Sequence, residues 1–319
     1  MKYRLLGRTG LQVSAVSFGA GPVSGWATDS DSTRQQDVVR RALEVGINWF
    51  DTAPTYSDGR SERALGQTLS ELKPHHQVHL ATKVRITDEA FLDLRGFIRK
   101  SVEQSLERLN RPQVTLLQLH NSVTAKRGDQ PTSVNVEDVL GTNGVLAAFE
   151  ELRDARLVSF LGLTGLGDAS SLKSVIASGR FDTVQAPYHL LNPSAGHDVT
   201  PEFSDLNLGN LFRDCQQQNM GVFAIRVFAG GALAQREPSA HTRITRFFPL
   251  DLYQRDRADA ALLERSLPNG LSLPEAAVRF VLKHRAVSSA LIGFGSQDEV
   301  DAAVRFAERF EHDPPSESD

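Results

Sequence analysis

Short apolar runs alternate with longer amphipathic stretches along nearly the whole chain. Several of the short runs lack the apolar–polar alternation of a half-exposed strand, which indicates parallel strands buried on both faces. Turn residues such as Gly46, Pro112 and Gly221 flank them. The pattern predicts eight strands, at residues 15–18, 47–51, 78–82, 114–119, 159–163, 183–186, 221–225 and 290–292.

Helical patterns fill the gaps between these strands. Asp31 or Ser32 is expected to cap the first helix, and Pro274 stands at a first-turn position of a later one. The predicted helices cover residues 33–45, 61–69, 93–109, 144–155, 168–178, 208–218 and 274–284, and another begins near Gln297.

Eight strands separated by helices in 319 residues predict an α/β fold, a (β/α)8 TIM barrel. Length alone, at about 150 residues per domain, suggests two domains, but no linker or long repeat divides the chain. We therefore expect a single domain over residues 1–310. A doubly wound sheet is the alternative, and it is disfavoured because Gly19-Ala20-Gly21, after the first strand, continues into Pro22 and Trp26 and not into a helix.

Three segments depart from simple alternation. Residues 3–14 are expected to form an N-terminal β-hairpin that caps the barrel bottom. The segments 121–143 and 226–255 are predicted as long loops after strands 4 and 7, on the face where barrel enzymes bind ligands. Residues 311–319 are acidic, contain two prolines and are expected to form a disordered tail.

Composition narrows the function classes. The chain has 35 Lys and Arg against 39 Asp and Glu, a net charge of −4, which disfavours binding to nucleic acid or an anionic membrane. Its one cysteine, Cys215, allows no intrachain disulfide, as is usual in a reducing compartment. No secretory h-region and no apolar run of about 18 residues is visible, so we expect a cytoplasmic protein without a membrane span.

Four ionisable residues stand at neighbouring strand ends. Asp51, Lys83 and His120 end the second, third and fourth strands, and Tyr56 follows Asp51 by five positions. On a barrel these ends face one mouth. A nearby ammonium lowers the pKa of a phenol, a carboxylate holds the ammonium, and a neutral histidine orients a substrate oxygen. Each residue singly is an ordinary turn, packing or surface residue, but together they suit proton transfer to or from a carbonyl or alcohol oxygen.

The stretches FDTAPTYSDGRSERALGQTL, ATKV and LLQLHN resemble the aldo-keto reductase superfamily, and the similarity extends from LLGRTGLQVSAVSFGAG to ALIGFGSQDEV. The run AIRVFAGGAL is closer to the branch that contains aldose dehydrogenases. The resemblance implies a (β/α)8 barrel and metal-free, NAD(P)(H)-dependent interconversion of aldehydes or ketones and alcohols by hydride transfer. In this resemblance Asp51, Tyr56, Lys83 and His120 match the catalytic tetrad, with Tyr56 as the general acid/base.

The resemblance also implies cofactor contacts, with some departures from the family. Gln185 matches the residue that binds the nicotinamide carboxamide, whereas Thr164-Gly165 replaces a Ser-Asn pair and Ile225-Arg226 replaces an aromatic-Ser run. Arg226 is a candidate for contact with the pyrophosphate or substrate. The full set of predicted cofactor-binding residues is Gly19, Thr164, Gln185, Ile225, Arg226, Gly293, Gly295, Ser296 and Glu299.

The adenosine end of the site bears on cofactor choice. A glycine turn at residues 293–296 precedes a helix and offers N–H groups to phosphate. Asp298 and Glu299 occupy the first helical turn, where carboxylates repel a 2′-phosphate or accept a ribose hydroxyl, which favours NAD over NADP. The alternative is that they only complement the helix dipole. Arg243 and Arg246 remain candidate sources of positive charge.

Two other functions compete with a carbonyl reductase or an aldose 1-dehydrogenase acting on a small carbonyl or sugar substrate. One is a Schiff-base lyase with Lys83 as the nucleophile, which the neighbouring Asp and Tyr disfavour. The other is a non-catalytic, nucleotide-binding regulatory member of the family, because such a protein can keep the tetrad.

Overall fold

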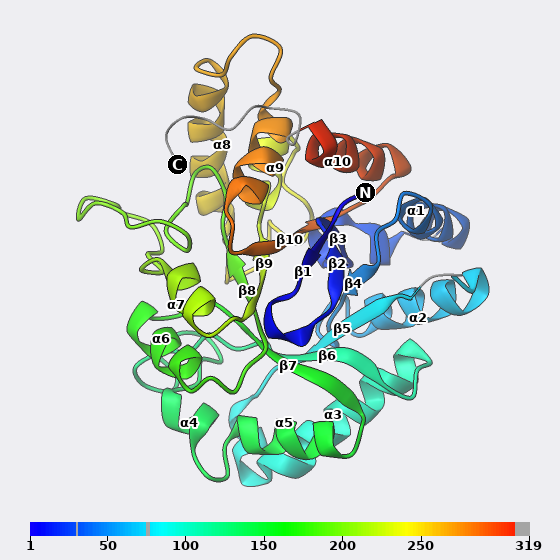
Figure 1. Cartoon of the computed structure of the whole chain (residues 1–319), viewed down its shortest axis with the longest axis vertical. Coiled ribbons are helices and arrows are strands. Elements are labelled where there is room, and N and C mark those ends of the chain that lie inside the picture. Colours follow the sequence, from blue (N-terminus) through cyan, green and yellow to red (C-terminus); the bar gives the residue numbers. More distant parts are fainter. Residues whose placement is uncertain (30, 75–76, 310–319) are drawn as a thin grey trace.

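The computed structural model describes residues 1–29, 31–74 and 77–309, and its centre is a closed barrel of eight parallel strands (Figure 1). Each strand pairs with the strands before and after it, and the last pairs with the first, which confirms the predicted fold class. In order around the barrel the strands are β3 (Val16–Gly19), β4 (Trp49–Asp51), β5 (His79–Val84), β6 (Val114–Leu119), β7 (Val158–Thr164), β8 (Thr183–Pro187), β9 (Gly221–Ile225) and β10 (Val287–Gly293).

Helices surround the barrel and cover the outer face of its strands (Figure 1). They are α1 (Ser32–Glu44), α2 (Arg60–Leu72), α3 (Leu94–Leu109), α4 (Val136–Leu140), α5 (Val145–Asp154), α6 (Ala169–Ala177), α7 (Leu211–Gln217), α8 (Leu250–Glu264), α9 (Leu273–Lys283) and α10 (Gln297–Arg309). Short 3-10 helices lie at η1 (Gly7–Thr9), η2 (Pro22–Ser24), η3 (Trp26–Thr28), η4 (Asp88–Leu92) and η5 (Ala229–Ala234). Asp31, not Ser32, caps α1, because its carboxylate accepts the backbone N–H groups of Thr33 and Arg34.

The N-terminal hairpin closes the bottom of the barrel, as the sequence predicts. Strands β1 (Tyr3–Leu5) and β2 (Gln12–Ser14) pair antiparallel, and they lie across the barrel end in Figure 1. Leu6 and Val13 of this hairpin belong to one buried apolar cluster with Trp49, Phe223 and other inward-facing strand residues. This cluster fills the lower part of the barrel, and Asp51 and Lys83 lie near the opposite, carboxyl-terminal ends of their strands.

A long segment follows the seventh strand, as predicted, but it ends earlier than the predicted range 226–255. This segment contains η5, and α8 begins at Leu250, within the range predicted as loop. Helix α8 buries Asp256 between Tyr253 and Ala260 and exposes Leu262, so its polar and apolar residues are not separated onto two faces and its sequence does not reveal it. The loop after the fourth strand also holds a short helix, α4, whose start is fixed by reciprocal hydrogen bonds between Asn135 and Asp138.

The remaining differences are small. Helix α7 begins three residues later than predicted, because Gly209 and Asn210 have positive φ angles that block a longer helix. Residues 311–319, predicted as a tail, lie outside the described residues.

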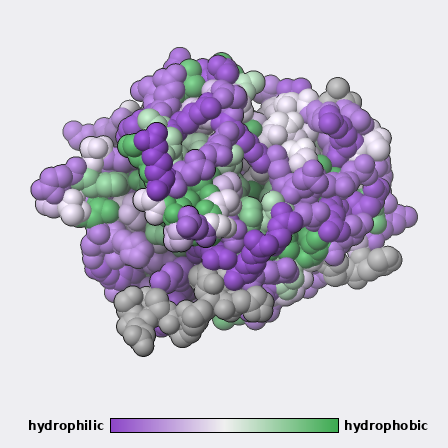
Figure 2. Space-filling view, turned by 90° about the horizontal axis from the view of Figure 1, so that it is seen from above, coloured by the Kyte–Doolittle hydropathy of each residue, from purple (hydrophilic) through white to green (hydrophobic). Residues whose placement is uncertain are grey.

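In the described part of the chain no helix is both long and apolar enough to cross a membrane. The face in Figure 2 is mostly hydrophilic, with hydrophobic residues in separate patches.

Candidate active site

Asp51 and Lys83 form a buried ion pair at the mouth of the barrel. Asp51 is the last residue of β4, Lys83 lies near the end of β5, and both side chains are 2% exposed. The Lys83 ammonium donates to the Asp51 carboxylate and to the backbone carbonyl of Thr52, at 2.8 Å. Burial opposes the charged form of Lys83, but Asp51 outweighs it, so the pKa of Lys83 lies above its usual value. Lys83 is therefore charged at neutral pH.

The second oxygen of Asp51 accepts two amide groups. Gln118 donates to it at 2.9 Å and Gln185 at 2.5 Å, from β6 and β8. Gln118 stands opposite Lys83 in the register of β5 and β6, and it was not among the site residues expected from the sequence. A signal was available: in LLQLH, Gln118 and His120 alternate with apolar residues, the period of side chains that share one strand face.

Tyr56 lies beside the ion pair. A tight turn after β4 holds it: its N–H donates to Ala53 O at 3.1 Å, and the turn ends at Gly59, whose φ of 77° favours glycine. The Lys83 ammonium is 4.8 Å from the centre of the Tyr56 ring. This arrangement stabilises negative charge that develops on the phenol oxygen.

His120 packs edge-on against Tyr56, with ring centres 5.6 Å apart. Burial, together with the positive charges of Lys83 and Arg85, holds the pKa of His120 well below its usual range. The imidazole is thus neutral at physiological pH, and its Nδ1 is 3.5 Å from Thr55 Oγ1. A neutral imidazole can donate one N–H to a substrate oxygen. The structure brings all four predicted tetrad residues together.

A cavity of about 210 Å³ opens beside this group and is lined by Asp51, Tyr56 and the segment after β9. A second cavity adjoins it and reaches Glu299 and Phe306 on α10. The two cavities share the lining residues Phe228, Ala234, Arg236, Ile292 and Gly293. Together they make an elongated site from the tyrosine to the start of α10, a shape suited to an extended dinucleotide.

The predicted cofactor residues divide into three sets. Gly19, Gln185, Ile225, Arg226 and Gly293 line the first cavity. Glu299 lines the adjoining cavity. Thr164, Gly295 and Ser296 line neither cavity.

Residues in and beside the elongated site fit a nicotinamide nucleotide. Thr164 pairs in register with Gln185, and its hydroxyl is buried without a hydrogen-bond partner, as expected of a group that awaits a ligand. A Cβ added to Gly293 would lie only 3.3 Å from the Ser24 Cβ, so glycine keeps this wall of the cavity open. Gln185 and Thr164 would hold the carboxamide, Ile225 would face the ring, and the 293–296 turn would take phosphate.

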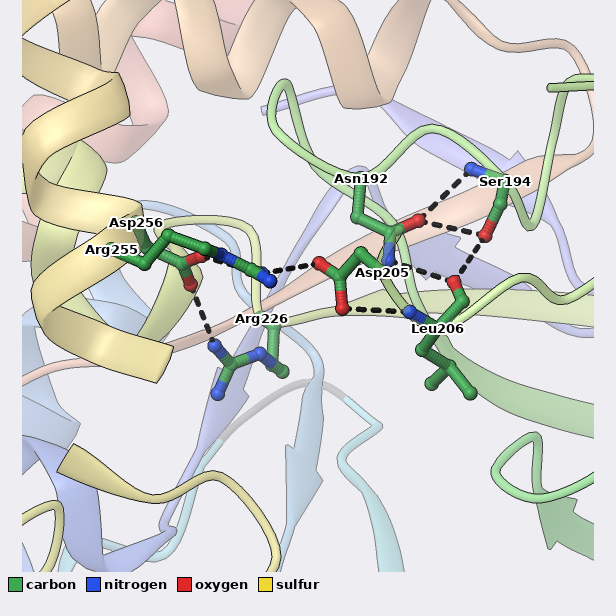
Figure 3. Close-up of polar contacts among 7 residues, drawn as sticks. All are labelled: Asn192, Ser194, Asp205, Leu206, Arg226, Arg255 and Asp256. Carbon is green, nitrogen blue, oxygen red and sulfur yellow. Dashed lines mark hydrogen bonds and ion pairs between the residues drawn. The ribbon is translucent and has the colours of Figure 1, made fainter. Parts of the chain in front are cut away.

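Arg226 lies between the first cavity and a third one that holds His189. Its guanidinium pairs with Asp256 of α8 at 3.3 Å and lies 4.0 Å from the centre of the Phe248 ring. Arg255 extends the network by pairing with Asp256 and, at 2.7 Å, with Asp205 (Figure 3). These contacts tie α8 to the loop after β8 across the barrel mouth.

Glu299 is not an isolated negative charge. Its carboxylate pairs with Arg236 at 2.5 Å and accepts the backbone N–H of Gly295 at 2.7 Å. Arg243 and Arg246 were the expected sources of positive charge near the adenosine end, and Arg236 was not among them. The contact of Arg236 with Glu299 joins the segment after β9 to the start of α10.

Comparison with known proteins agrees with the fold. The profile described as the Aldo/keto reductase family matches residues 15–314. The chain belongs to the aldo/keto reductase family. As an aldo/keto reductase it is an oxidoreductase enzyme, and the cofactors of this family are NAD(P)(H). The predicted resemblance is therefore confirmed.

Two curated relatives cover most of this aldo/keto reductase. L-galactose dehydrogenase of Arabidopsis thaliana is 28% identical over 95% of this chain and 87% of its own. D-threo-aldose 1-dehydrogenase of Pseudomonas sp is 27% identical over 89% and 86%. Among solved structures, aldo-keto reductase AKR11C1 from Bacillus halodurans in its holo form has the same fold, with a TM-score of 0.72, 24% identity and coverage of 99% and 93%.

Proposed function

We propose that this aldo/keto reductase moves hydride between NAD(P)(H) and the carbonyl carbon of a small substrate, with Tyr56 as the general acid/base. The observation that supports it best is the position of Tyr56 beside Lys83, whose charge Asp51 maintains. In this proposal residues 1–310 work as one domain, because the site draws on strands from β3 to β10.

When bound, the cofactor supplies the hydride, and side chains of the protein transfer the proton. In reduction the Tyr56 hydroxyl donates its proton to the carbonyl oxygen, and Lys83 stabilises the phenolate that remains. In oxidation Tyr56 takes the alcohol proton. Neutral His120 donates a hydrogen bond to the substrate oxygen and orients it. A Schiff-base lyase is disfavoured, because a nucleophilic lysine must be neutral and Asp51 keeps Lys83 charged.

The oxidative direction on an aldose is the second candidate function. Its support is the names of two relatives, an L-galactose dehydrogenase and a D-threo-aldose 1-dehydrogenase. For the cofactor we propose a preference for NAD(H), from the two carboxylates in the first turn of α10. The pairing of Glu299 with Arg236 weakens that argument, since a positive charge is also present.

Turnover by Tyr56→Phe is the direct test. We expect NAD(P)H absorbance changes with a panel of aldehydes and sugars in the wild type, and rates lower by about a hundredfold or more in the variant, because the proton donor is lost. Tyr3→Phe is the matched control, since Tyr3 lies on the hairpin at the opposite end of the barrel and is 47% exposed. Equal rates in Tyr56→Phe and wild type would rule out Tyr56 as the acid.

A further inference from the structure

Arg85 lies two residues after Lys83 along the chain, nearer to the barrel mouth. Side chains two residues apart on a strand point to the same face, about 6–7 Å apart along it. Lys83 faces the barrel interior, and Val84 between them packs into the outer core under the helices. Arg85 directly follows the end of β5, so it continues the inward row of Lys83 above the tetrad.

The Arg85 guanidinium has no carboxylate partner within residues 1–29, 31–74 and 77–309. Its Nε is buried without an acceptor, and its one aromatic contact is the Phe247 ring, 4.7 Å from the guanidinium carbon. Arg226, also at the mouth, differs: it has both an aromatic face, Phe248, and a carboxylate, Asp256. An unpaired buried donor is costly in a folded protein, which marks Arg85 as a group whose partner arrives from outside.

The charges around the reacting position favour an anion. Lys83 and Arg85 carry two positive charges and Asp51 carries one negative charge, while His120 is neutral. The positive charges of Lys83 and Arg85 both help to lower the pKa of His120. The local excess of one positive charge attracts anionic substrates to the mouth.

We propose that Arg85 binds a carboxylate carried by the carbonyl substrate, a few bonds from the reacting carbon. The planar fork of arginine matches the two oxygens of a carboxylate. Because Arg85 lies two residues after Lys83 on one strand face, short oxo acids and uronic acids are the substrate class that we propose. This inference rests on the proposed function, because it names the substrate class of the same site.

Succinic semialdehyde and butanal test it, because they share a four-carbon chain and differ in the terminal carboxylate. With NADH or NADPH supplied, we expect the wild type to favour succinic semialdehyde by about tenfold or more in kcat/KM. In Arg85→Met that ratio falls to about one, mainly through a higher KM for the acid, and Arg85→Lys keeps part of the preference. Arg99→Met, on the outer helix α3, is the matched control and keeps the wild-type ratio.

Calorimetric binding of succinate separates this inference from the proposed function. Succinate has no reducible carbonyl, and we expect the wild type and Arg99→Met to bind it and Arg85→Met to bind it about tenfold more weakly or not at all. If neither aldehyde is reduced but succinate still binds through Arg85, the proposed function fails and the carboxylate site stands. A wild-type ratio near one, or an unchanged ratio in a folded Arg85→Met, overturns the inference.

Discussion

Asp51 is the residue on which the other polar groups at the mouth depend. It neutralises Lys83 with one oxygen and accepts Gln118 and Gln185 with the other. Asp51→Asn leaves a buried ammonium without a counter-charge, so we expect the free energy of unfolding to fall by about 3 kcal/mol or more. The pKa of Lys83 falls as well, because burial is no longer opposed, and the alkaline limb of the kcat–pH profile moves to lower pH.

Urea unfolding and the pH profile of kcat check this prediction. Asp58→Asn is the matched control, since Asp58 is an exposed carboxylate in the turn after Tyr56 and asparagine tolerates its φ of 54°. Wild-type stability and an unshifted profile in Asp51→Asn would show that Asp51 does not hold the charge of Lys83.

Some of these residues could be predicted from the sequence and others could not. Asp51, Lys83 and His120 could be predicted because each ends a recognisable buried strand, and parallel strand ends meet at one mouth. Gln118 lies inside its strand, where an inward polar residue looks like any core position. Arg85 lies two residues after Lys83, and the family resemblance gives a role to Lys83 but none to Arg85. Its missing partner is visible only when all neighbouring side chains are placed.

At the scale of elements, the contact between Arg236 and Glu299 links the segment after β9 to α10 over the adenosine end. Glu299→Gln removes the charge that holds Arg236 and frees the guanidinium for a 2′-phosphate. We expect the ratio of Kd for NADPH to Kd for NADH to fall by about tenfold, because charge-assisted hydrogen bonds to phosphate are strong.

Fluorescence titration with each cofactor measures this ratio without turnover. Asp298→Asn is the matched control, because Asp298 is an exposed neighbour in the same helical turn. The same ratio in Glu299→Gln and wild type would mean that Arg236 does not reach the phosphate.

Elements with a regular apolar face were predictable, and those without one were not. All eight barrel strands and the long helices α1, α3 and α9 coincide with the predicted segments to within a few residues. Helix α8 was missed because ion pairs such as those of Arg255 and Arg257 hold it, and because polar and apolar residues are mixed on its faces. Contacts between distant charges leave no periodic signal in a sequence.

For the whole molecule, buried histidines make stability depend on pH. Burial lowers the pKa of five described histidines: His79, His120, His189, His241 and His284. His189 is 3% exposed and its pKa falls to about 3. Below about pH 6.5 these histidines bind protons in the unfolded chain but not in the folded chain. The free energy of unfolding therefore decreases as the pH falls, by up to about 1.4 kcal/mol per pH unit for each such histidine.

Thermal unfolding from pH 7 to pH 4 tests this expectation. We expect Tm of the wild type to fall as pH falls, and the fall to be shallower in His189→Gln, because one buried neutral histidine is gone. Identical slopes for the two proteins would assign the acid sensitivity to other groups.

Closure of the barrel has a consequence for the newly made chain. Phe18 of β3 pairs with Ile292 of β10, and the ribosome adds Ile292 about 270 residues after Phe18. At about 5–20 residues per second, one edge of β3 waits roughly 15–55 s for its partner. During translation this edge is an unsatisfied template for strand pairing, and Leu6 and Val13 lack the Leu291 side chain of their cluster. The closed barrel, which has no free strand edge once complete, therefore exposes one during most of its synthesis.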